Sequence, residues 1–310
     1  MRMDTIRPDN GLLGTGRAAA KLILLGEHVV LYGRPAISLP VPDLGVTATA
    51  HRSGGNAARP DDTAVARTAI AAVCRYLRVP QADLAVAVDS DIPRERGLGS
   101  SAATAAAIIA AVADLSDRKL SDETLFTLVQ ESEALAHGNA SGIDARTVIS
   151  AVGPLWFQDG VVRPLPVADS EVRAVLVVAD TGVAGSTRQA VALVRRRLAE
   201  LGAEGEALLE RAGQLSTGAA EDLRLGRFAE LGRAMTAAQG ILVRLGVSCP
   251  AVDGLVAAAL AGGALGAKLS GGGLGGCVIA LTTDAPAVRA ALLAAGAQRC
   301  LEVPLGPVRT

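Results

Sequence analysis

A serine-containing glycine turn stands directly before an alanine-rich segment, and this spacing suits an anion-binding site. The sequence reads Pro93-x-x-x-Gly97-Leu98-Gly99-Ser100-Ser101-Ala102. Glycines let a backbone approach a ligand closely, and a helix that starts here would point free N–H groups and a partial positive charge at an anion. The two serine hydroxyls could also reach a phosphate or a metal. The segment has neither the Walker A nor the Rossmann spacing, and a serine-capped helix after a tight turn is the structural alternative.

Two acidic residues further along the chain could serve the same anion site. Glu133 falls in the last turn of an expected helix, and Asp144 ends the segment HGNASGID, which starts at His137. A carboxylate opposes the dipole at a helix C-terminus. A bound Mg²⁺ would reverse that penalty, since magnesium takes one or two carboxylates together with phosphate oxygens. A solvated carboxylate and an ordinary turn are the structural alternative.

Two further segments combine charge or glycine with a strand. Lys21 opens the apolar run KLILLGEH, where a buried ammonium is costly unless a carboxylate pairs with it; a lysine that reaches water at the strand edge is the alternative. The segment KLSGGGLGGC, residues 268–277, suits a backbone that passes close to a ligand or another loop. None of the structural alternatives explains why these segments occur together in one chain.

Short apolar runs alternate with longer helical patterns, which predicts an α/β or α+β protein. We expect strands at residues 21–25, 46–50, 84–88, 172–178 and 277–281. We expect helices at residues 63–77, from 100, from 121 to about 137, from 186, across 195–238, and at 251–261. A proline-containing stretch near 161–169 predicts the boundary between two domains, residues 1–168 and 169–310.

The composition is that of an ordinary globular protein and excludes several function classes. The chain has 310 residues, 50% of them hydrophobic and 20% charged, with a formal net charge of -1. No excess of Lys and Arg is available for nucleic-acid phosphates, and at 2% the aromatic residues are too few for stacking on single strands. The polar N-terminus has no signal-peptide core, and no apolar run reaches the about 18 residues that a bilayer needs. The four scattered cysteines indicate reduced thiols. We therefore expect a cytoplasmic protein without nucleic-acid or membrane partners.

Together, the four segments resemble the GHMP family of small-molecule kinases, whose phosphate loop reads P-x-x-x-G-L-G-S-S-A. The resemblance also rests on GEHVVLYG at 26–33, HGNASGID at 137–144, DTGVAGST at 180–187 and KLSGGGLGGC at 268–277. Within the family, the chain is most similar to the members that phosphorylate mevalonate. In two departures, Ala140 replaces the proline of HGNPSG and Leu274 interrupts an often all-glycine loop. The first could loosen the turn before Asp144, and the second could crowd the phosphate.

The resemblance implies an α+β protein with the two-domain GHMP kinase fold. Residues 1–168 would form a ribosomal-protein-S5-like, ATP-binding domain, and residues 169–310 a ferredoxin-like domain, with the site in the cleft between them. The cofactors would be ATP and Mg²⁺. The resemblance allows a homodimer, and the sequence leaves the oligomeric state open.

The residue roles of the family carry over to matching positions. The phosphate cradle would comprise Pro93, Gly97, Leu98, Gly99, Ser100, Ser101 and Ala102. Ser101 and Glu133 would hold Mg²⁺, while Asp144 would be the general base and Lys21 its electrostatic partner. The small-molecule substrate, mevalonate, would contact Lys21, Glu27, His28, Asp144 and Thr187. The group that reads its carboxylate is open, with Arg146 a candidate because it lies near Asp144 in sequence. Residues 53–62 are a candidate location for the adenine pocket.

The expected reaction is ATP-dependent phosphorylation of the 5-hydroxyl of mevalonate to 5-phosphomevalonate, a step of isoprenoid biosynthesis. Asp144 would accept the hydroxyl proton while Lys21 and Mg²⁺ stabilise charge on the transferring group, because positioning and electrostatics supply most of the rate of phosphoryl transfer. The nearest alternative is another kinase of the family, for phosphomevalonate or homoserine, and a diphosphomevalonate decarboxylase shares the fold. A non-catalytic metabolite sensor is a further alternative, which the presence of Lys21, Glu133 and Asp144 argues against.

Overall fold

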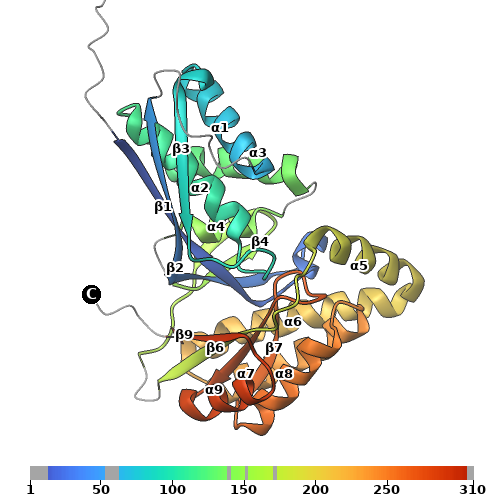
Figure 1. The fold of residues 1–310 in the computed structure, drawn as a ribbon. Coiled ribbons are helices and arrows are strands. Elements are labelled where there is room, and N and C mark those ends of the chain that lie inside the picture. Colours follow the sequence, from blue (N-terminus) through green and yellow to red (C-terminus); the bar gives the residue numbers. More distant parts are fainter. Residues whose placement is uncertain (1–12, 53–62, 138–140, 151–152, 170–172, 306–310) are drawn as a thin grey trace, which may run out of the picture.

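Two antiparallel sheets, each covered by helices, build the molecule (Figure 1). The computed structural model of the chain describes residues 13–52, 63–137, 141–150, 153–169 and 173–305. The first sheet has the strand order β1-β2-β4-β5, with β3 also paired to β2, and the second has the order β7-β8-β6-β9. The expected α+β class is confirmed.

The first sheet carries the helices of the N-terminal half. Its strands are β1 (Leu13–Leu25), β2 (Ala36–Arg52), β3 (Leu84–Ser90), β4 (Leu155–Gln158) and β5 (Val161–Pro164). The helices are α1 (Ala64–Leu77), α2 (Ser100–Leu115), α3 (Asp122–His137) and α4 (Ile143–Val148), with the 3-10 turns η1 (Val29–Tyr32) and η2 (Gln81–Asp83). Helix α2 packs directly on β1 and β2, and α1 and α3 pack on α2.

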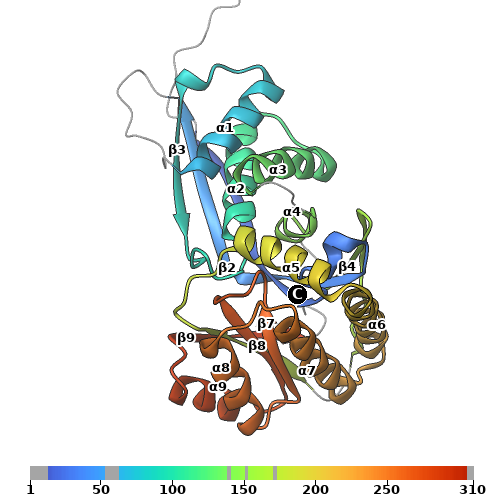
Figure 2. The same ribbon diagram turned by 90° about the vertical axis from the view of Figure 1, so that its right-hand side faces the viewer.

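The second sheet carries the helices of the C-terminal half. Its strands are β6 (Ala174–Asp180), β7 (Gly266–Ser270), β8 (Cys277–Thr282) and β9 (Arg299–Leu305). Its helices are α5 (Thr187–Leu201), α6 (Ala203–Leu225), α7 (Phe228–Arg244), α8 (Pro250–Ala261) and α9 (Ala285–Ala294). Figure 2 shows α5 at the junction, between the helices of the upper half and those of the lower half. Because α6 also contacts β1 and β2, the domain division at 168/169 stays a prediction.

Helix α2 lies unusually close to β1 because the facing residues are small. A Cβ atom at Gly16 would lie 2.0 Å from the carbonyl oxygen of Ala107, and one at Gly14 would lie 2.2 Å from that of Ala111. Ten residues of α2 are buried, seven of them alanines. The alanine-rich sequence therefore permits a helix-to-sheet contact that larger side chains would prevent.

Two simpler features complete the fold. No described helix has the length and apolarity that crossing a membrane requires. All four cysteines are free thiols, and burial raises the pKa of Cys277 to about 12. Such a thiol stays protonated and unreactive at neutral pH.

The contact between β1 and α2 makes a stability prediction. A Gly16→Val change forces three added methyl-sized groups against the backbone of α2, and overpacking of this kind costs about 1–3 kcal/mol. We expect the melting temperature to fall by about 5 °C, since 1 kcal/mol corresponds to about 2–4 °C in a chain of this size class. Gly218→Ala in α6 is the matched control, because nothing lies within 4 Å of the added Cβ. An unchanged melting temperature for Gly16→Val would contradict the close packing.

Candidate active site

A cleft of about 1280 Å³ lies between the two halves and collects most of the predicted site residues. The predicted residues that line it are Lys21, Glu27, His28, Gly97, Gly99, Ser100, Ser101, Glu133, Asp144 and Thr187. They come from β1 and the loop after it, from the start of α2, and from α3, α4 and α5. Residues that are distant in sequence and were expected to act together are therefore brought to one cavity.

The start of α2 and the end of β1 fit together through a glycine. Gly99 is the N-cap of α2 with φ 74°, a left-handed conformation that favours glycine. A Cβ atom there would lie 2.6 Å from Cγ of Lys21, and the N–H of Lys21 donates to the carbonyl of Leu98 at 3.0 Å. The glycine thus lets the lysine side chain pass beneath the first turn of α2, whose helix dipole favours an anion.

Three of the residues predicted for the phosphate cradle do not line the cleft. The side chains of Leu98 and Ala102 are buried in the main hydrophobic core, and neither they nor Pro93 line the cleft. Leu98 acts on the site through its carbonyl, which holds the backbone of Lys21. That these three residues bind the nucleotide stays a prediction, and only their backbone atoms could do so.

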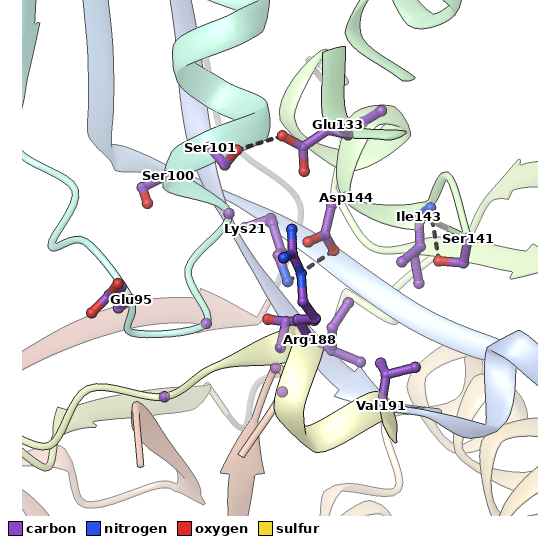
Figure 3. A pocket seen from close by; sticks show the side chains of 18 of the residues that line it. Lys21, Glu95, Ser100, Ser101, Glu133, Ser141, Ile143, Asp144, Arg188 and Val191 are labelled. Carbon is purple, nitrogen blue, oxygen red and sulfur yellow. Dashed lines mark hydrogen bonds and ion pairs between the residues drawn. The ribbon is translucent and has the colours of Figure 1, made fainter. Parts of the chain in front are cut away.

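Lys21 and Asp144 form an ion pair in the middle of the cleft. The ammonium of Lys21 lies 2.9 Å from Oδ1 of Asp144, and the side chains are 3% and 39% exposed, respectively. Asp144 stands in the first turn of α4, where the helix dipole favours a negative charge. In Figure 3 the carboxylate of Asp144 points toward Lys21 and into the space below the start of α2. The buried lysine therefore holds an accessible carboxylate in place.

Glu133 lies beside the cradle in a different environment. Ser101 Oγ donates to its Oε1 at 2.5 Å (Figure 3), and Glu133 is only 7% exposed. Burial raises the pKa of Glu133 from its ordinary 4.5 to about 7; the hydrogen bond from Ser101 opposes the shift, nearby Asp144 adds to it and Lys21 opposes it. The carboxyl group is thus poised to gain or lose its proton near neutral pH.

The Ser101 hydroxyl and the Glu133 carboxylate together fit a magnesium ion. A hydroxyl and one carboxylate are hard oxygen ligands, and Mg²⁺ completes its shell with phosphate oxygens and water rather than with an all-protein cage. Among the described residues no group of three or more His, Cys, Asp or Glu could hold a metal alone. A cation here would offset the cost of the buried Glu133 charge.

A buried ion pair adjoins the cleft through Glu27, which lines it. Lys268 on β7 is 0% exposed, and its ammonium donates to Glu27 and to the carbonyl of Leu269 at 2.6 Å. Burial raises the pKa of Glu27 and lowers that of Lys268, and the pairing opposes both shifts. Glu27 was expected to contact the substrate; although it lines the cleft, its carboxylate is engaged by a lysine of the other half.

His28 is neutral and already uses one ring nitrogen. Its Nε2 lies 2.8 Å from the carbonyl oxygen of Gly272, and burial lowers the pKa of His28 to about 4. The neutral ring must therefore carry its proton on Nε2 and donate it to that carbonyl. Only Nδ1, an acceptor, is left for a ligand.

The glycine cluster after β7 packs mainly against other loops. Only Gly271 and Gly272 of this cluster line the cleft, and a Cβ at Gly272 would lie 3.0 Å from Oγ1 of Thr187. Leu274 has φ 60°, packs on the core and does not line the cleft, so it does not crowd the site. Ala140 and residues 53–62 lie outside the described residues.

Two arginines of α5 were missed by the sequence reasoning. Arg188 and Arg195 line the cleft from one face of the helix, seven residues apart, and Arg188 points toward Asp144 in Figure 3. Thr187 was predicted to contact the substrate, and Arg188 and Arg195 follow it two helical turns apart. That helical spacing is the signal that could have pointed to them. Arg146 is engaged elsewhere: it pairs with Glu123 at 2.7 Å, stacks on Phe126 and does not line the cleft.

The fold and cleft define a two-domain scaffold of the phosphotransferase type, with an anion cradle, a lysine–carboxylate pair and a second carboxylate in one cavity. Family models for the GHMP kinases N terminal domain and the GHMP kinases C terminal region match residues 46–151 and 219–298. The mevalonate kinase of Pyrococcus abyssi is 37% identical over 297 residues, covering 85% of this chain and 87% of that protein. The chain belongs to the GHMP kinase family.

Solved structures show the same fold. The crystal structure of L. major mevalonate kinase in complex with R-mevalonate superposes with a TM-score of 0.82 at 25% identity, covering 96% of this chain and 97% of the other. The phosphomevalonate kinase of Streptococcus pneumoniae, in complex with phosphomevalonate and AMPPNP, reaches 0.78 at 18% identity, covering 93% and 99%. The fold is thus shared by kinases with different acceptors.

The raised pKa of Glu133 predicts how stability depends on pH. The folded protein holds this proton more tightly than the unfolded chain, so without ligands its stability falls as the pH rises from 4.5 to about 7. In Glu133→Gln this part of the slope is absent. Thermal melts between pH 4.5 and 8 measure it, and Glu131→Gln, in the same helix but 38% exposed, is the control that keeps the wild-type slope.

The same pKa predicts that magnesium binds better as Glu133 ionises. The Mg²⁺ concentration for half-maximal nucleotide binding falls as the pH rises to about 7 and is then flat. Glu133→Gln needs more magnesium at every pH. Any pH dependence that remains in this variant comes from the titration of the nucleotide itself, so the variant is the reference for the wild type. Identical magnesium titrations for the two proteins at every pH would rule Glu133 out as a ligand.

Proposed function

We propose that this protein is a mevalonate kinase, which transfers the γ-phosphoryl group of ATP to the 5-hydroxyl of mevalonate. The observation that carries the proposal is the Lys21–Asp144 ion pair, which faces the start of α2 inside one cleft. The choice of acceptor is supported by the sequence relatives that are named mevalonate kinase. The cytoplasmic location and the homodimer stay predictions.

Asp144 is the general base of the proposed reaction. Its carboxylate is the accessible member of the pair and accepts the proton of the attacking hydroxyl. Lys21 is held within the cleft wall, where its charge stabilises the carboxylate before the transfer and the phosphoryl oxygens during it.

The start of α2 binds the phosphates of ATP in this proposal. The first turn of α2, which begins at Ser100, and the helix dipole favour the negative charge of the triphosphate. Ser101 and Glu133 would hold Mg²⁺, which when bound neutralises part of the triphosphate charge. Val65, Val88 and Ile92 line the same cleft and offer an apolar wall for the adenine base.

The acceptor side of the cleft is suited to a small anion. Arg188 and Arg195 on α5 place positive charge there, and Nδ1 of His28 can accept a hydrogen bond from a hydroxyl. A hydroxy acid such as mevalonate offers both a carboxylate and hydroxyl groups. These arginines take the place of Arg146 as the proposed readers of the carboxylate.

A substrate panel tests the proposal directly. Purified protein is incubated with ATP, Mg²⁺ and mevalonate, and mass spectrometry should detect 5-phosphomevalonate. Phosphomevalonate and homoserine in place of mevalonate should give little product, and diphosphomevalonate should release no carbon dioxide. A clear preference for any of these, or nucleotide binding with no product at all, would replace the proposal by the corresponding alternative.

The proton-transfer role of Asp144 makes a kinetic prediction. Asp144→Asn should lower kcat by about 10²–10⁴ and leave ATP binding largely intact, because only the base is lost. Lys21→Met should also lower kcat, and the double variant should be little worse than the single ones, since groups that act as a unit are not additive. Glu200→Gln, on the exposed side of α5, is the control. Near-normal turnover in Asp144→Asn would refute the assignment of the base.

A further inference from the structure

An arginine inside the phosphate loop has no role in the mechanism above. Arg96 stands one residue before Gly97, and its side chain is 19% exposed. Its Nε donates to Oδ1 of Asp180 at 2.8 Å, and its Nη2 donates to the carbonyl of Gly182 at 3.2 Å. Since β6 ends at Asp180, this arginine joins the phosphate loop of the first half to the second sheet.

The same guanidinium also braces its own loop. Nη1 of Arg96 donates to the carbonyls of Arg94 and Glu95, each at 3.4 Å. Glu95 has φ 58°, a left-handed conformation that is strained for a residue with a side chain. The N–H of Gly185 donates to the carbonyl of Glu95 at 2.9 Å. A strained turn of this kind persists only when its surroundings hold it, and here Gly185 of the other half supplies one of the contacts that do so.

Asp180 organises the opposite side of the contact. The Oδ1 atom that accepts from Arg96 also accepts from the N–H of Gly182 at 2.8 Å, and the Asp180 side chain is 14% exposed. One carboxylate oxygen therefore fixes both the guanidinium and the turn after β6. A largely buried carboxylate without its partner would be costly and would repel phosphates that bind nearby.

The two joined loops lead to the two sides of the cleft. Beyond Arg96 the chain passes Gly97, whose added Cβ would lie 2.6 Å from the carbonyl oxygen of Ser270, and reaches Ser100 at the start of α2. Beyond Gly182 it reaches Ser186, the N-cap of α5, and Thr187. The distance between these helix starts is thus set in part by the Arg96–Asp180 pair.

We propose that Arg96 is a positioning residue, which through Asp180 holds the phosphate cradle at its working distance from the start of α5. The proposal rests on the proposed function only in taking the cradle as the site of the ATP phosphates. A cradle that shifts by about 1 Å loses on the order of 10²-fold in rate at most. Because Lys21 and Gly185 still anchor the loop backbone, we expect kcat to fall by less than this.

The kinetic test separates positioning from stability. In Arg96→Met we expect the KM for ATP to rise about tenfold and kcat to fall about tenfold, with the KM for mevalonate changed about twofold or less. The double variant Arg96→Met/Asp180→Asn removes both charges and so recovers melting temperature, yet it keeps the raised KM for ATP. Arg96→Lys retains a charge for Asp180 and should recover part of the loss. Arg233→Met is the control, since its pair with Glu230 is solvent-exposed.

A second readout does not depend on the acceptor. The rise in melting temperature on adding ADP and Mg²⁺ should be smaller in Arg96→Met and in the double variant than in the wild type and in Arg233→Met. If the wild type forms no 5-phosphomevalonate but this difference is seen, the proposed function fails and the positioning role stands. If the double variant has wild-type KM for ATP, kcat and nucleotide-induced shift, Arg96 contributes only to stability and the inference is overturned.

Discussion

The buried ion pair between Glu27 and Lys268 determines how the two halves meet. Neither side chain has appreciable contact with water, so each charge is stabilised by the other and by few further groups. Removing one partner of such a pair costs about 3–5 kcal/mol, because the remaining charge is left buried and unpaired. The geometry of β1 relative to β7 therefore has little freedom.

Further contacts use that fixed geometry. Ser270, two residues after Lys268, accepts from the N–H of Ile23 at 3.0 Å and donates to its carbonyl at 3.1 Å. His28, next to Glu27, binds the carbonyl of Gly272. The strand that carries Lys21 is thus attached to the second sheet at Ile23 and again at the turn after the strand, both beyond the lysine. The position of the Lys21–Asp144 ion pair is a consequence of the contact between the halves.

The two carboxylates of the site differ in burial, and this difference separates their chemistry. Asp144 is open to the cleft and paired with Lys21, whereas Glu133 is buried and holds its proton up to about pH 7. A pair of acids whose environments differ in this way can take different roles at one pH. The accessible carboxylate suits proton transfer, and the buried one gains most from a cation.

Local signals in the sequence were enough for the strongly periodic elements and for the chemistry-bearing segments. Helix α1 was expected at 63–77 and spans Ala64–Leu77, and α2 starts at Ser100 as expected. Strand β1 was expected to begin at Lys21 but begins at Leu13. The earlier start was missed because Gly14 and Gly16 carry no strand signal; their small size permits the close contact with α2. The strands β4, β5, β7 and β9 were not predicted, since runs of four to seven residues have little periodicity.

Long-range pairing could not be read from the chain. Lys268 lies 241 residues from Glu27, and no local pattern states which carboxylate a buried lysine will meet. Arg146 was a candidate because it is near Asp144 in sequence, but on α4 it faces Glu123 and Phe126 of α3. Sequence proximity on a short helix does not fix direction, since residues two positions apart point to different sides.

Acceptor choice must depend on side chains rather than on the backbone. Kinases for mevalonate and for phosphomevalonate share this fold closely, so the position of the cradle and of the base cannot distinguish their substrates. The residues that can do so project from α5 and from the turn after β1, where Arg188, Arg195 and His28 face the cleft. Two cationic groups and one neutral ring favour a small anionic alcohol over a neutral sugar. Since the turn after β6 leads into α5 and is attached to the phosphate loop through Arg96 and Gly185, this contact sets where the phosphate loop lies relative to the arginines of α5.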